Sequence, residues 1–467
     1  MGNKSSAAQT TEAVPPQYFL VPNVPVPSLK PSDLDFSQTS GKPILCAGWV
    51  APHGSLSWSK KNVVYSTDIE VPVPRPHEVR VKIYAAGVNP ADAQRTTALA
   101  QLSPTAQKNR KTTAHPVSRH SAAPLEFPYV MGIEGAGVVE SVGWDAELEE
   151  QNGGLSDIRV GDRVAFLADL SKGSGGSFCQ YALVDRDIVW KLPEIIDAPT
   201  ISPSGEVVPG RLIDFVEAAT LPAAAATAYI ALFDKLRVEP QRTIFISGAS
   251  GGVGSVAVQL AHYFGLYVIA SCSSPNVQYV QSLGADYVID YTRTDVVKDI
   301  LKFTENYGVD YLLECAGASL SEMHAEAVRF GGSVCLLTGL LVPRSDLVFR
   351  RQLSVHYVFL GMLHQDAIAR QQLQSLGQLV LQLYAQGAFS VVTEQVPFVQ
   401  AADALDVRAS GHGRGKVVLG NFHQNEDLEE RQRRRRVYLY EKAQMQLQKD
   451  TADLTDPKVE VGKEGSR

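Results

Sequence analysis

The sequence has few cysteines, and their spacing fits no common cysteine site. The 467 residues contain five, at Cys46, Cys179, Cys272, Cys315 and Cys335. They are scattered, odd in number and include no Cys-x-x-Cys pair, so the sequence predicts neither a disulfide framework nor a structural zinc site. The simplest expectation is a reducing compartment, and we therefore expect a cytoplasmic protein.

Long apolar runs and an excess of positive charge are also missing. The longest largely apolar stretch, 215–232, contains Glu217 and Pro222. We expect it to be buried in the protein, because a membrane-spanning helix needs about 20 strongly apolar residues. The polar, proline-rich N-terminus does not resemble a secretory signal. The net charge of -7 argues against a nucleic-acid partner.

The first six residues carry a lipidation pattern. Met1 to Ser6 fit M-G-x-x-x-[ST], in which Gly2 accepts myristate once Met1 is removed. The alternative is an unmodified tail. One acyl chain holds a membrane only weakly and reversibly, so weak membrane association is the most that Gly2 would provide.

The N-terminal half has the pattern of a small β-barrel. After an unstructured stretch, 1–40, short strand-like segments are separated by glycines. We expect these strands at 63–73, 77–84, 129–142, 163–166 and 178–184. Three segments look like lengthened surface loops, 98–125, 144–157 and 197–212.

From about residue 216 strands alternate with helices, which is typical of βαβ units and a parallel sheet. The expected strands are 243–247, 267–271, 287–290, 309–314 and 333–337. A long helix at 366–386 and strands at 391–396 and 415–419 follow. The tail 423–467 is charged, and its arginine run 433–436 is read as solvated. We therefore expect a barrel domain from 41–215 and 364–422, and a Rossmann domain from 216–363.

A glycine-rich turn gives the most specific functional signal. The segment Gly248-Ala249-Ser250-Gly251-Gly252-Val253-Gly254 follows a strand and opens a helix, as a dinucleotide fingerprint requires. Gly251 and Gly252 let the backbone approach a pyrophosphate, and Gly254 allows close packing of helix and strand. We count Ser250 and Val253 with these glycines as cofactor-binding candidates.

The next strand end bears on the choice of cofactor. An NAD site usually has Asp or Glu there, but 271–276 reads Ser-Cys-Ser-Ser-Pro-Asn. A carboxylate would repel a 2′-phosphate, so its absence favours NADPH, with NADH as the alternative. Ser273, Asn276 and Tyr291 are the candidate contacts.

Whole phrases resemble the zinc-free quinone oxidoreductases, the zeta-crystallin-like family of the medium-chain dehydrogenase/reductase superfamily. Gly87-Val88-Asn89-Pro90-Ala91-Asp92 is similar to that family's GVNPxD segment. Further similar phrases follow in the family's order, at 127–139, 160–164, 175–181, 218–222, 227–229, 282–286 and 415–418. The resemblance covers roughly 45–420, apart from the three lengthened loops.

This resemblance implies an α/β protein with a GroES-like β-barrel catalytic domain and a Rossmann doubly wound parallel sheet. The active site is then expected in the cleft between the two, and a homodimer through the edge of the Rossmann sheet. Zinc-dependent relatives have Cys where Asn89 stands and His where Ile133 stands. Neither Asn nor Ile is a plausible zinc ligand here, so the resemblance implies metal-free chemistry.

By the same resemblance Asn89 lies beside the nicotinamide and donates a hydrogen bond to the substrate oxygen. The alternative is that Asn89 only orders its loop, as we expect Asp92 to do. The remaining nicotinamide-pocket candidates are Thr227, Gly339, Leu340, Phe359 and Gly361. Lys416 either reaches the cofactor or the domain junction, or is exposed on an edge strand. We find no compelling proton donor; His356 and His364 are more simply structural.

Three functions therefore remain open. The first is zinc-independent, NADPH-dependent hydride transfer to a quinone or a related electron-poor carbonyl, since a quinone accepts hydride without a Lewis acid. The second is an NADPH-dependent 2-enoyl or enone reductase, although no Tyr follows Asp92 as a proton donor. The third is an NADPH-sensing protein with little turnover.

Overall fold

The computed structural model describes most of the chain between residues 43 and 422. The described residues are 43–52, 58–95, 128–143, 158–168, 175–193, 200–201, 207–208, 212–337, 345–409, 413–420 and 422. Gly2, the tails 1–40 and 423–467, the expected loops 98–125 and 144–157, and Gly339 and Leu340 lie outside the described residues.

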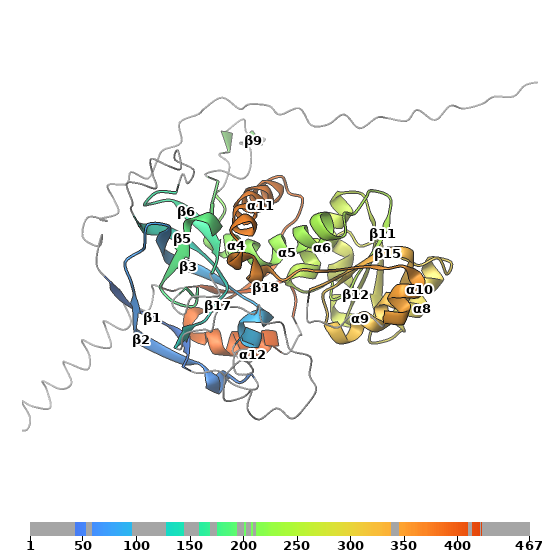
Figure 1. Cartoon of the computed structure of the whole chain (residues 1–467), viewed down its shortest axis with the longest axis horizontal. Coiled ribbons are helices and arrows are strands. Elements are labelled where there is room, and N and C mark those ends of the chain that lie inside the picture. The colour runs from blue at the N-terminus through green and yellow to red at the C-terminus, as the bar shows by residue number, and fades with distance from the viewer. Residues whose placement is uncertain are drawn as a thin grey trace, which may run out of the picture. The chain divides into compact units, whose positions relative to one another are not determined.

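A parallel sheet forms one of two domains (Figure 1). Its six strands pair in the order β13-β12-β11-β14-β15-β16, and all five pairings are parallel. This is the order 3-2-1-4-5-6 of a dinucleotide-binding doubly wound sheet. The strands are β11 (Thr243–Ile246), β12 (Tyr267–Cys272), β13 (Tyr287–Asp290), β14 (Val309–Glu314), β15 (Val328–Leu336) and β16 (Ser354–Tyr357). The sequence predicted the first five; β16 was missed.

Alternating side chains of this sheet pack against helices on both faces. In β11, Ile244 and Ile246 join the core that contains residues of α6, whereas Phe245 joins a second core with residues of α8. This two-residue period is what a strand covered on both faces requires. The helices are α6 (Gly252–Tyr263), α7 (Val277–Ser282), α8 (Val296–Phe303), α9 (Ala318–His324) and α10 (Ser345–Arg351), with short turns η6 (Ser274–Asn276) and η7 (Ala325–Ala327).

The other domain is built on mixed sheets. One sheet has the path β17-β18-β3-β5-β6-β8, with β7 also on β3, and a smaller sheet has the order β2-β1-β4. A bridge between Gly48 and Cys179 joins the two. The strands are β1 (Ile44–Ala51), β2 (Val64–Val71), β3 (Glu78–Val88), β4 (Tyr129–Val130), β5 (Glu134–Val142), β6 (Arg163–Leu167), β7 (Tyr181–Asp185), β8 (Val189–Lys191), β17 (Thr393–Pro397) and β18 (Lys416–Gly420).

One expectation for this domain was wrong, and one of the two alternatives for Lys416 is excluded. Residues 197–212 are not only loop, because β9 (Thr200–Ile201) and β10 (Val207–Val208) pair antiparallel within them. Lys416 is not on an edge strand, because β18 lies between β17 and β3 and the side chain is 3% exposed. Strand neighbours far apart in the chain cannot be read from local spacing. Strand β1 was not predicted from the sequence.

The apolar stretch that begins at residue 215 packs inside the protein, as expected. It consists of α4 (Phe215–Ala218), α5 (Ala226–Tyr229) and two π-helical turns, η4 (Leu221–Ala225) and η5 (Ile230–Lys235). The run Phe215–Lys235 is long and apolar enough to cross a membrane by composition, but 72% of its most apolar window is buried within the molecule. It contacts α6 of the parallel-sheet domain and β3 and β5 of the mixed-sheet domain.

The C-terminal helices complete the mixed-sheet domain. Helix α11 (Ala367–Ala385) begins after Asp366, whose carboxylate accepts the N–H of Ala369 at 2.9 Å, a standard N-cap. This helix packs on β8, and the Trp190 indole N–H donates to the Leu373 carbonyl at 3.1 Å. The remaining helices are α12 (Ala401–Ala409), η2 (Lys60–Asn62), η3 (Arg186–Ile188), η8 (Leu360–Gln365) and η9 (Phe398–Gln400).

Candidate active site

The glycine-rich turn lies between β11 and α6, as the sequence predicted. Gly254 has to be glycine, because a Cβ there would lie 2.3 Å from the Gly248 carbonyl oxygen. A Cβ on Gly252 would lie 2.8 Å from Cδ of Lys416. The first N–H groups of α6 have no acceptor within the helix and are suited to bind a phosphate. The turn therefore fits a dinucleotide pyrophosphate.

The start of β18 joins this turn to the mixed-sheet domain. The Gly415 N–H donates to the carbonyl of Ser250 at 2.8 Å. The Lys416 stem then passes Gly252 and places its ammonium against β3 and β5. One segment thus contacts both the predicted phosphate site and the predicted Asn89 site.

Four polar side chains form what we call the junction centre: Asn89, Asp92, Glu134 and Lys416. The Lys416 ammonium donates to Asn89 Oδ1 and to Glu134 Oε1, each at 2.5 Å. The Asn89 Nδ2 donates to Glu134 Oε1 at 2.7 Å and to the Gly87 carbonyl at 3.3 Å. Glu134 is fully buried, Lys416 is 3% exposed and Asn89 is 9% exposed.

The helix break at Pro222 supplies a further donor to this centre. Pro222 stands in the first turn of η4, where N–H groups have no helical acceptor. The Ala223 N–H donates instead to Glu134 Oε2 at 2.7 Å. Glu134 therefore accepts hydrogen bonds at both oxygens, which is how a buried carboxylate is tolerated.

Asp92 is the unusual member of the junction centre. Its Oδ2 accepts the Asn89 N–H at 2.8 Å, as expected for a residue that orients the loop. Its Oδ1 is buried and has no hydrogen-bond partner among the described residues. Burial raises the pKa of Asp92 to about 7, against the opposing effects of the Asn89 N–H and the Lys416 charge. The centre thus holds one ammonium, one fully paired carboxylate and one carboxyl that gains its charge near neutral pH.

A second group of contacts forms at the end of β12, which we call the β12-loop contact. Asn276 Nδ2 donates to Ser273 Oγ at 3.2 Å, so two predicted cofactor residues touch. Arg414 donates to Asn276 Oδ1 at 3.2 Å and to the Pro275 carbonyl at 3.0 Å. Its guanidinium carbon lies 4.8 Å from the Tyr279 ring centroid. Arg414 brings a cation to a loop that has none in its own sequence.

A carboxylate from the neighbouring strand also stands near this loop. Asp290, at the end of β13, accepts hydrogen bonds from Ser274 and Thr292 and pairs with Arg293 at 3.3 Å. These hydrogen bonds, from Ser274 first, lower the pKa of Asp290. Tyr291 follows it, 49% exposed.

The other predicted residues are spread over several elements. Thr227 is half-buried on α5, Gly361 is half-buried in η8, and Phe359 is 66% exposed. Among the considered histidines, His356 lies on β16, where burial and then the charges of Lys235 and Arg237 lower its pKa. The structure thus groups Asn89 with Lys416 and the turn, and Ser273 with Asn276. Among the described residues, Phe359 makes no hydrogen bond or ring contact with either group.

Sequence reasoning missed Glu134 and Arg414. Glu134 follows Ile133 within a phrase already noted, and a Glu in an otherwise apolar strand was a usable signal of a buried polar role. Arg414 had no such signal, because its partners are about 140 residues away in the chain. Only the fold brings it to β12.

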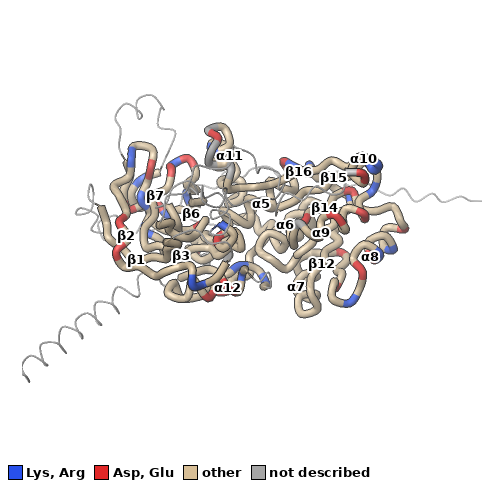
Figure 2. The backbone as a smooth tube through the Cα atoms, turned by 60° about the horizontal axis from the view of Figure 1, so that its bottom comes forward, with Lys and Arg blue, Asp and Glu red and all other residues tan. Residues whose placement is uncertain are grey.

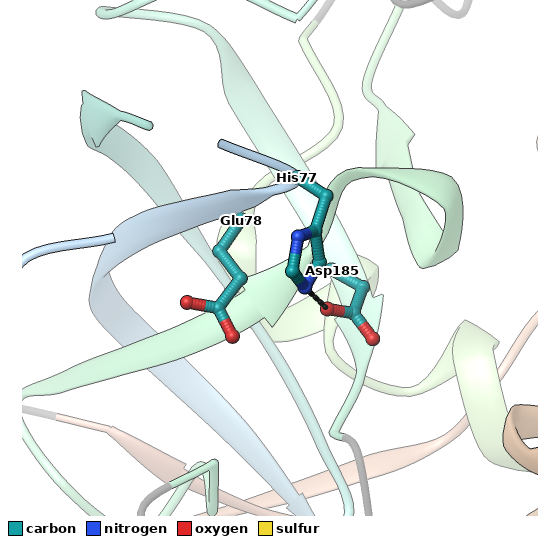
Figure 3. Close-up of side chains that lie close together, drawn as sticks. All are labelled: His77, Glu78 and Asp185. Carbon is teal, nitrogen blue, oxygen red and sulfur yellow. Dashed lines mark ion pairs between the residues drawn. The ribbon is translucent and has the colours of Figure 1, made fainter. Parts of the chain in front are cut away.

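One further cluster has metal-ligand residue types (Figure 3). His77, Glu78 and Asp185 offer ligand atoms within 4.8 Å of one another. However, an Arg370 nitrogen lies 3.7 Å from Asp185 Oδ2, and the Arg75 N–H donates to Glu78 Oε2 at 3.0 Å. A guanidinium at the carboxylate opposes a second cation, so we assign no metal here. Basic and acidic residues are interspersed over the described backbone (Figure 2).

Comparisons with known proteins match both domains. Residues 75–194 match the family model described as alcohol dehydrogenase GroES-like domain, and 252–375 match the one described as zinc-binding dehydrogenase. A human quinone oxidoreductase is 29% identical over 363 residues, covering 76% of this chain and 92% of its own. A 2-methylene-furan-3-one reductase from Solanum lycopersicum is 29% identical over 356 residues, covering 76% and 74%.

A solved structure agrees. A probable oxidoreductase from Mycobacterium abscessus has a TM-score of 0.59 at 25% identity, covering 80% of this chain and 98% of that one. The predicted fold, a GroES-like domain with a Rossmann-type parallel sheet, is confirmed.

Proposed function

Since this chain is a quinone-oxidoreductase-like member of the medium-chain dehydrogenase/reductase superfamily, we propose that it is a metal-independent, NADPH-dependent reductase of quinones and related electron-poor carbonyls. The superfamily makes it an oxidoreductase with a nicotinamide cofactor. What we propose beyond this is that the cofactor is NADPH, that the acceptor is a quinone or related carbonyl, and that no metal is needed.

The observation that carries this proposal is the Lys416 ammonium in the junction centre. It lies 2.5 Å from both Asn89 Oδ1 and Glu134 Oε1, two atoms that would otherwise attract a metal ion. A second cation there would be repelled by the ammonium. Ile133, next to Glu134, has no ligand atom. These residues do not fit zinc, and the fixed positive charge is supplied by lysine.

When bound, the reduced nicotinamide supplies the hydride. We assign Lys416 the role of favouring negative charge on the acceptor oxygen, because a cation held in a buried site acts with little screening. Asn89 supplies the hydrogen bond. Its 3.3 Å contact with the Gly87 carbonyl is the weaker of its two donations, and a substrate oxygen can replace it. Quinol oxygens then take protons from water.

NADPH is favoured by two features at the β12-loop contact. The loop 271–276 has no carboxylate, and Arg414 adds a guanidinium beside Ser273 and Asn276. Guanidinium binds phosphate with two parallel hydrogen bonds, whereas a ribose hydroxyl gains little from it. Asp290 opposes a phosphate less than a free carboxylate would, because Ser274, Thr292 and Arg293 already engage it.

The proposal is tested by steady-state oxidation of NADPH and NADH with phenanthrenequinone. We expect turnover with a higher kcat/KM for NADPH. An enone acceptor, with product analysis, runs in parallel. Faster reduction of the enone carbon–carbon double bond would indicate an enone reductase instead of a quinone reductase. The name of the Solanum lycopersicum relative, a 2-methylene-furan-3-one reductase, favours that alternative. Tight NADPH binding without oxidation of either acceptor would indicate the sensing role.

We also propose a homodimer through β16. This strand is the last of the parallel sheet, and among the described strands only β15 pairs with it. Phe349 and Phe359, on either side of β16 in the chain, are 83% and 66% exposed. Light scattering of the purified chain would give a dimer mass; a monomer at micromolar concentration would refute the proposal.

The location proposed is cytoplasmic, with weak membrane association through an acylated Gly2. Labelling with a myristate analogue tests this. If a Gly2→Ala variant is labelled as strongly as the unsubstituted chain, Gly2 is not the acylated residue.

A further inference from the structure

Two cysteines far apart in the chain meet in the mixed-sheet domain. The sulfurs of Cys46, on β1, and Cys179, just before β7, are 3.2 Å apart although 133 positions separate them. Neither belongs to a disulfide in the structure, and both are buried, 5% and 1% exposed. We infer that Cys46 and Cys179 are a dithiol that closes to a disulfide under sustained oxidation and locks β1 to the segment before β7.

The backbone around the pair is already fixed on both sides. Gly48 bridges to Cys179, the Trp49 N–H donates to the Phe178 carbonyl at 2.8 Å, and the Gln180 N–H donates to the Ala47 carbonyl at 3.0 Å. Disulfides form without strain only where the two backbones are held close in a suitable orientation. This pair meets the first requirement before any bond forms.

Gly48 makes the close approach feasible. A Cβ at this position would lie 2.7 Å from Cδ1 of Ile69, 2.9 Å from the Phe178 carbonyl oxygen and 3.1 Å from Cα of Cys179. Any larger residue would push the two segments apart. The glycine therefore maintains the contact between the strands that carry the thiols.

The surroundings explain why the pair stays reduced under mild conditions. The two cysteines belong to a small apolar cluster with Val50, Val71, Val130 and Leu183. The hydrogen bond with Cys46, and then burial, raise the pKa of Cys179 well above its ordinary value. Because the thiolate is the reactive form, bulky electrophiles react slowly here. A small oxidant is needed, and once one sulfur reacts the other is in place.

Hydrogen peroxide is a suitable two-electron oxidant for this reaction. One thiolate attacks a peroxide oxygen, breaks the O–O bond and becomes a sulfenic acid, and the released hydroxide takes up a proton to leave as water. The second thiol then attacks the sulfenic sulfur, forms the S–S bond and releases a second water. The two sulfurs together lose two electrons, and the peroxide gains them.

The disulfide would constrain the backbone that leads to the junction centre. The Met131 N–H donates to the Trp49 carbonyl at 2.9 Å, and the Phe178 N–H donates to the Met131 carbonyl at 2.7 Å. Both segments joined by the disulfide thus hold Met131, three residues before Glu134. Linking them removes conformations of the unfolded chain over a long loop, which stabilises the folded state.

The test treats the reduced full-length chain with hydrogen peroxide, blocks remaining thiols and maps peptides without reduction. We expect a linked Cys46–Cys179 peptide and a rise in Tm of about 4 °C or more, reversed by dithiothreitol. Cys179→Ser should lose both changes. Cys272→Ser, which removes a buried cysteine elsewhere, should keep both.

Peptide mapping of the unsubstituted chain decides the question even if Cys179→Ser does not fold. Sulfinic or sulfonic acid at Cys46 or Cys179 without the linked peptide would overturn the inference. A bridge from either of them to Cys272, Cys315 or Cys335 would do the same.

Discussion

Two cations, two residues apart, have opposite environments in this molecule. Lys416 is 3% exposed and holds Asn89 and Glu134 at 2.5 Å, whereas Arg414 is exposed and binds Asn276 and Pro275 at 3.2 and 3.0 Å. Gly415, at φ +55°, separates them. The buried charge must stay paired, because water cannot replace its partners. The exposed charge can exchange its protein partners for a ligand at little cost.

We therefore expect Lys416 and Arg414 to have separate roles, although they lie on one short segment. The junction centre keeps its geometry because any change leaves a charge unpaired in a buried site. The β12-loop contact is weak enough for a phosphate to displace. Substitutions in the two places should therefore differ in size and in the property that they change.

The largest effect is expected from Glu134→Gln. The Lys416 ammonium would lose its buried counter-charge, and the free energy of unfolding should fall by about 3–5 kcal/mol. Urea denaturation measures this. The control is Asp403→Asn, which breaks the exposed Lys60–Asp403 pair at 2.9 Å and should lower the free energy of unfolding much less, because solvent screens an exposed ion pair. Equal losses in the two variants would show that the buried Lys416–Glu134 pair contributes no more to stability than an exposed pair.

The next effect is a pH dependence caused by Asp92. Burial raises its pKa from 3.8 to about 7, so the folded state binds this proton more tightly than the unfolded state. The resulting stabilisation is fully present below about pH 3.8 and is lost as the pH rises through 7. At 1.36 kcal/mol per pKa unit the loss is about 4 kcal/mol.

Asp92→Asn should remove this slope, because an amide stays neutral and its oxygen still accepts the Asn89 N–H. The measurement is the free energy of unfolding from pH 4 to 8, taken as the difference between the variant and the unsubstituted chain. Asp187→Asn, at an exposed aspartate, is the control. A difference that does not change with pH would show that Asp92 is already ionised throughout.

A smaller effect, on catalysis, is expected from Lys416→Met. Methionine keeps much of the stem that passes Gly252 but removes the ammonium, so kcat should fall about 100-fold while the KM for NADPH changes little. Steady-state kinetics at a temperature where the variant is folded measures both. A raised KM with an unchanged kcat would assign Lys416 to cofactor binding instead.

The smallest effect is expected from Arg414→Ala. Loss of a charged hydrogen-bond donor should raise the KM for NADPH about 10-fold, with kcat and the KM for NADH nearly unchanged. Arg350→Ala, which removes an exposed arginine paired with Asp346 on α10, is the matched control. An equal rise for both cofactors would remove Arg414 from phosphate recognition.

Features made by neighbouring residues in the chain could be predicted from the sequence, whereas contacts between distant residues could not. The turn from Gly248 to Gly254 was predictable because strand, glycines and helix are contiguous. The parallel sheet was predictable because its strands alternate with helices along the chain. The junction centre was only half predictable. Asn89 and Lys416 were found through family resemblance, but their contact depends on β18 pairing with β3 across more than 300 residues.

Glu134 and Arg414 show the physical limit more sharply. Their roles are set by partners on other elements, Ala223 for the first and Asn276 for the second. No spacing rule relates such positions. The edge-strand alternative for Lys416 failed for the same reason, since β17 rather than β18 is the outer strand.

The most direct test of metal-independent reduction is NADPH oxidation by phenanthrenequinone after dialysis against a strong chelator, with bound zinc determined by mass spectrometry. We expect undiminished turnover by protein that contains less than stoichiometric zinc. Turnover that disappears with the zinc and returns when zinc is added would contradict it.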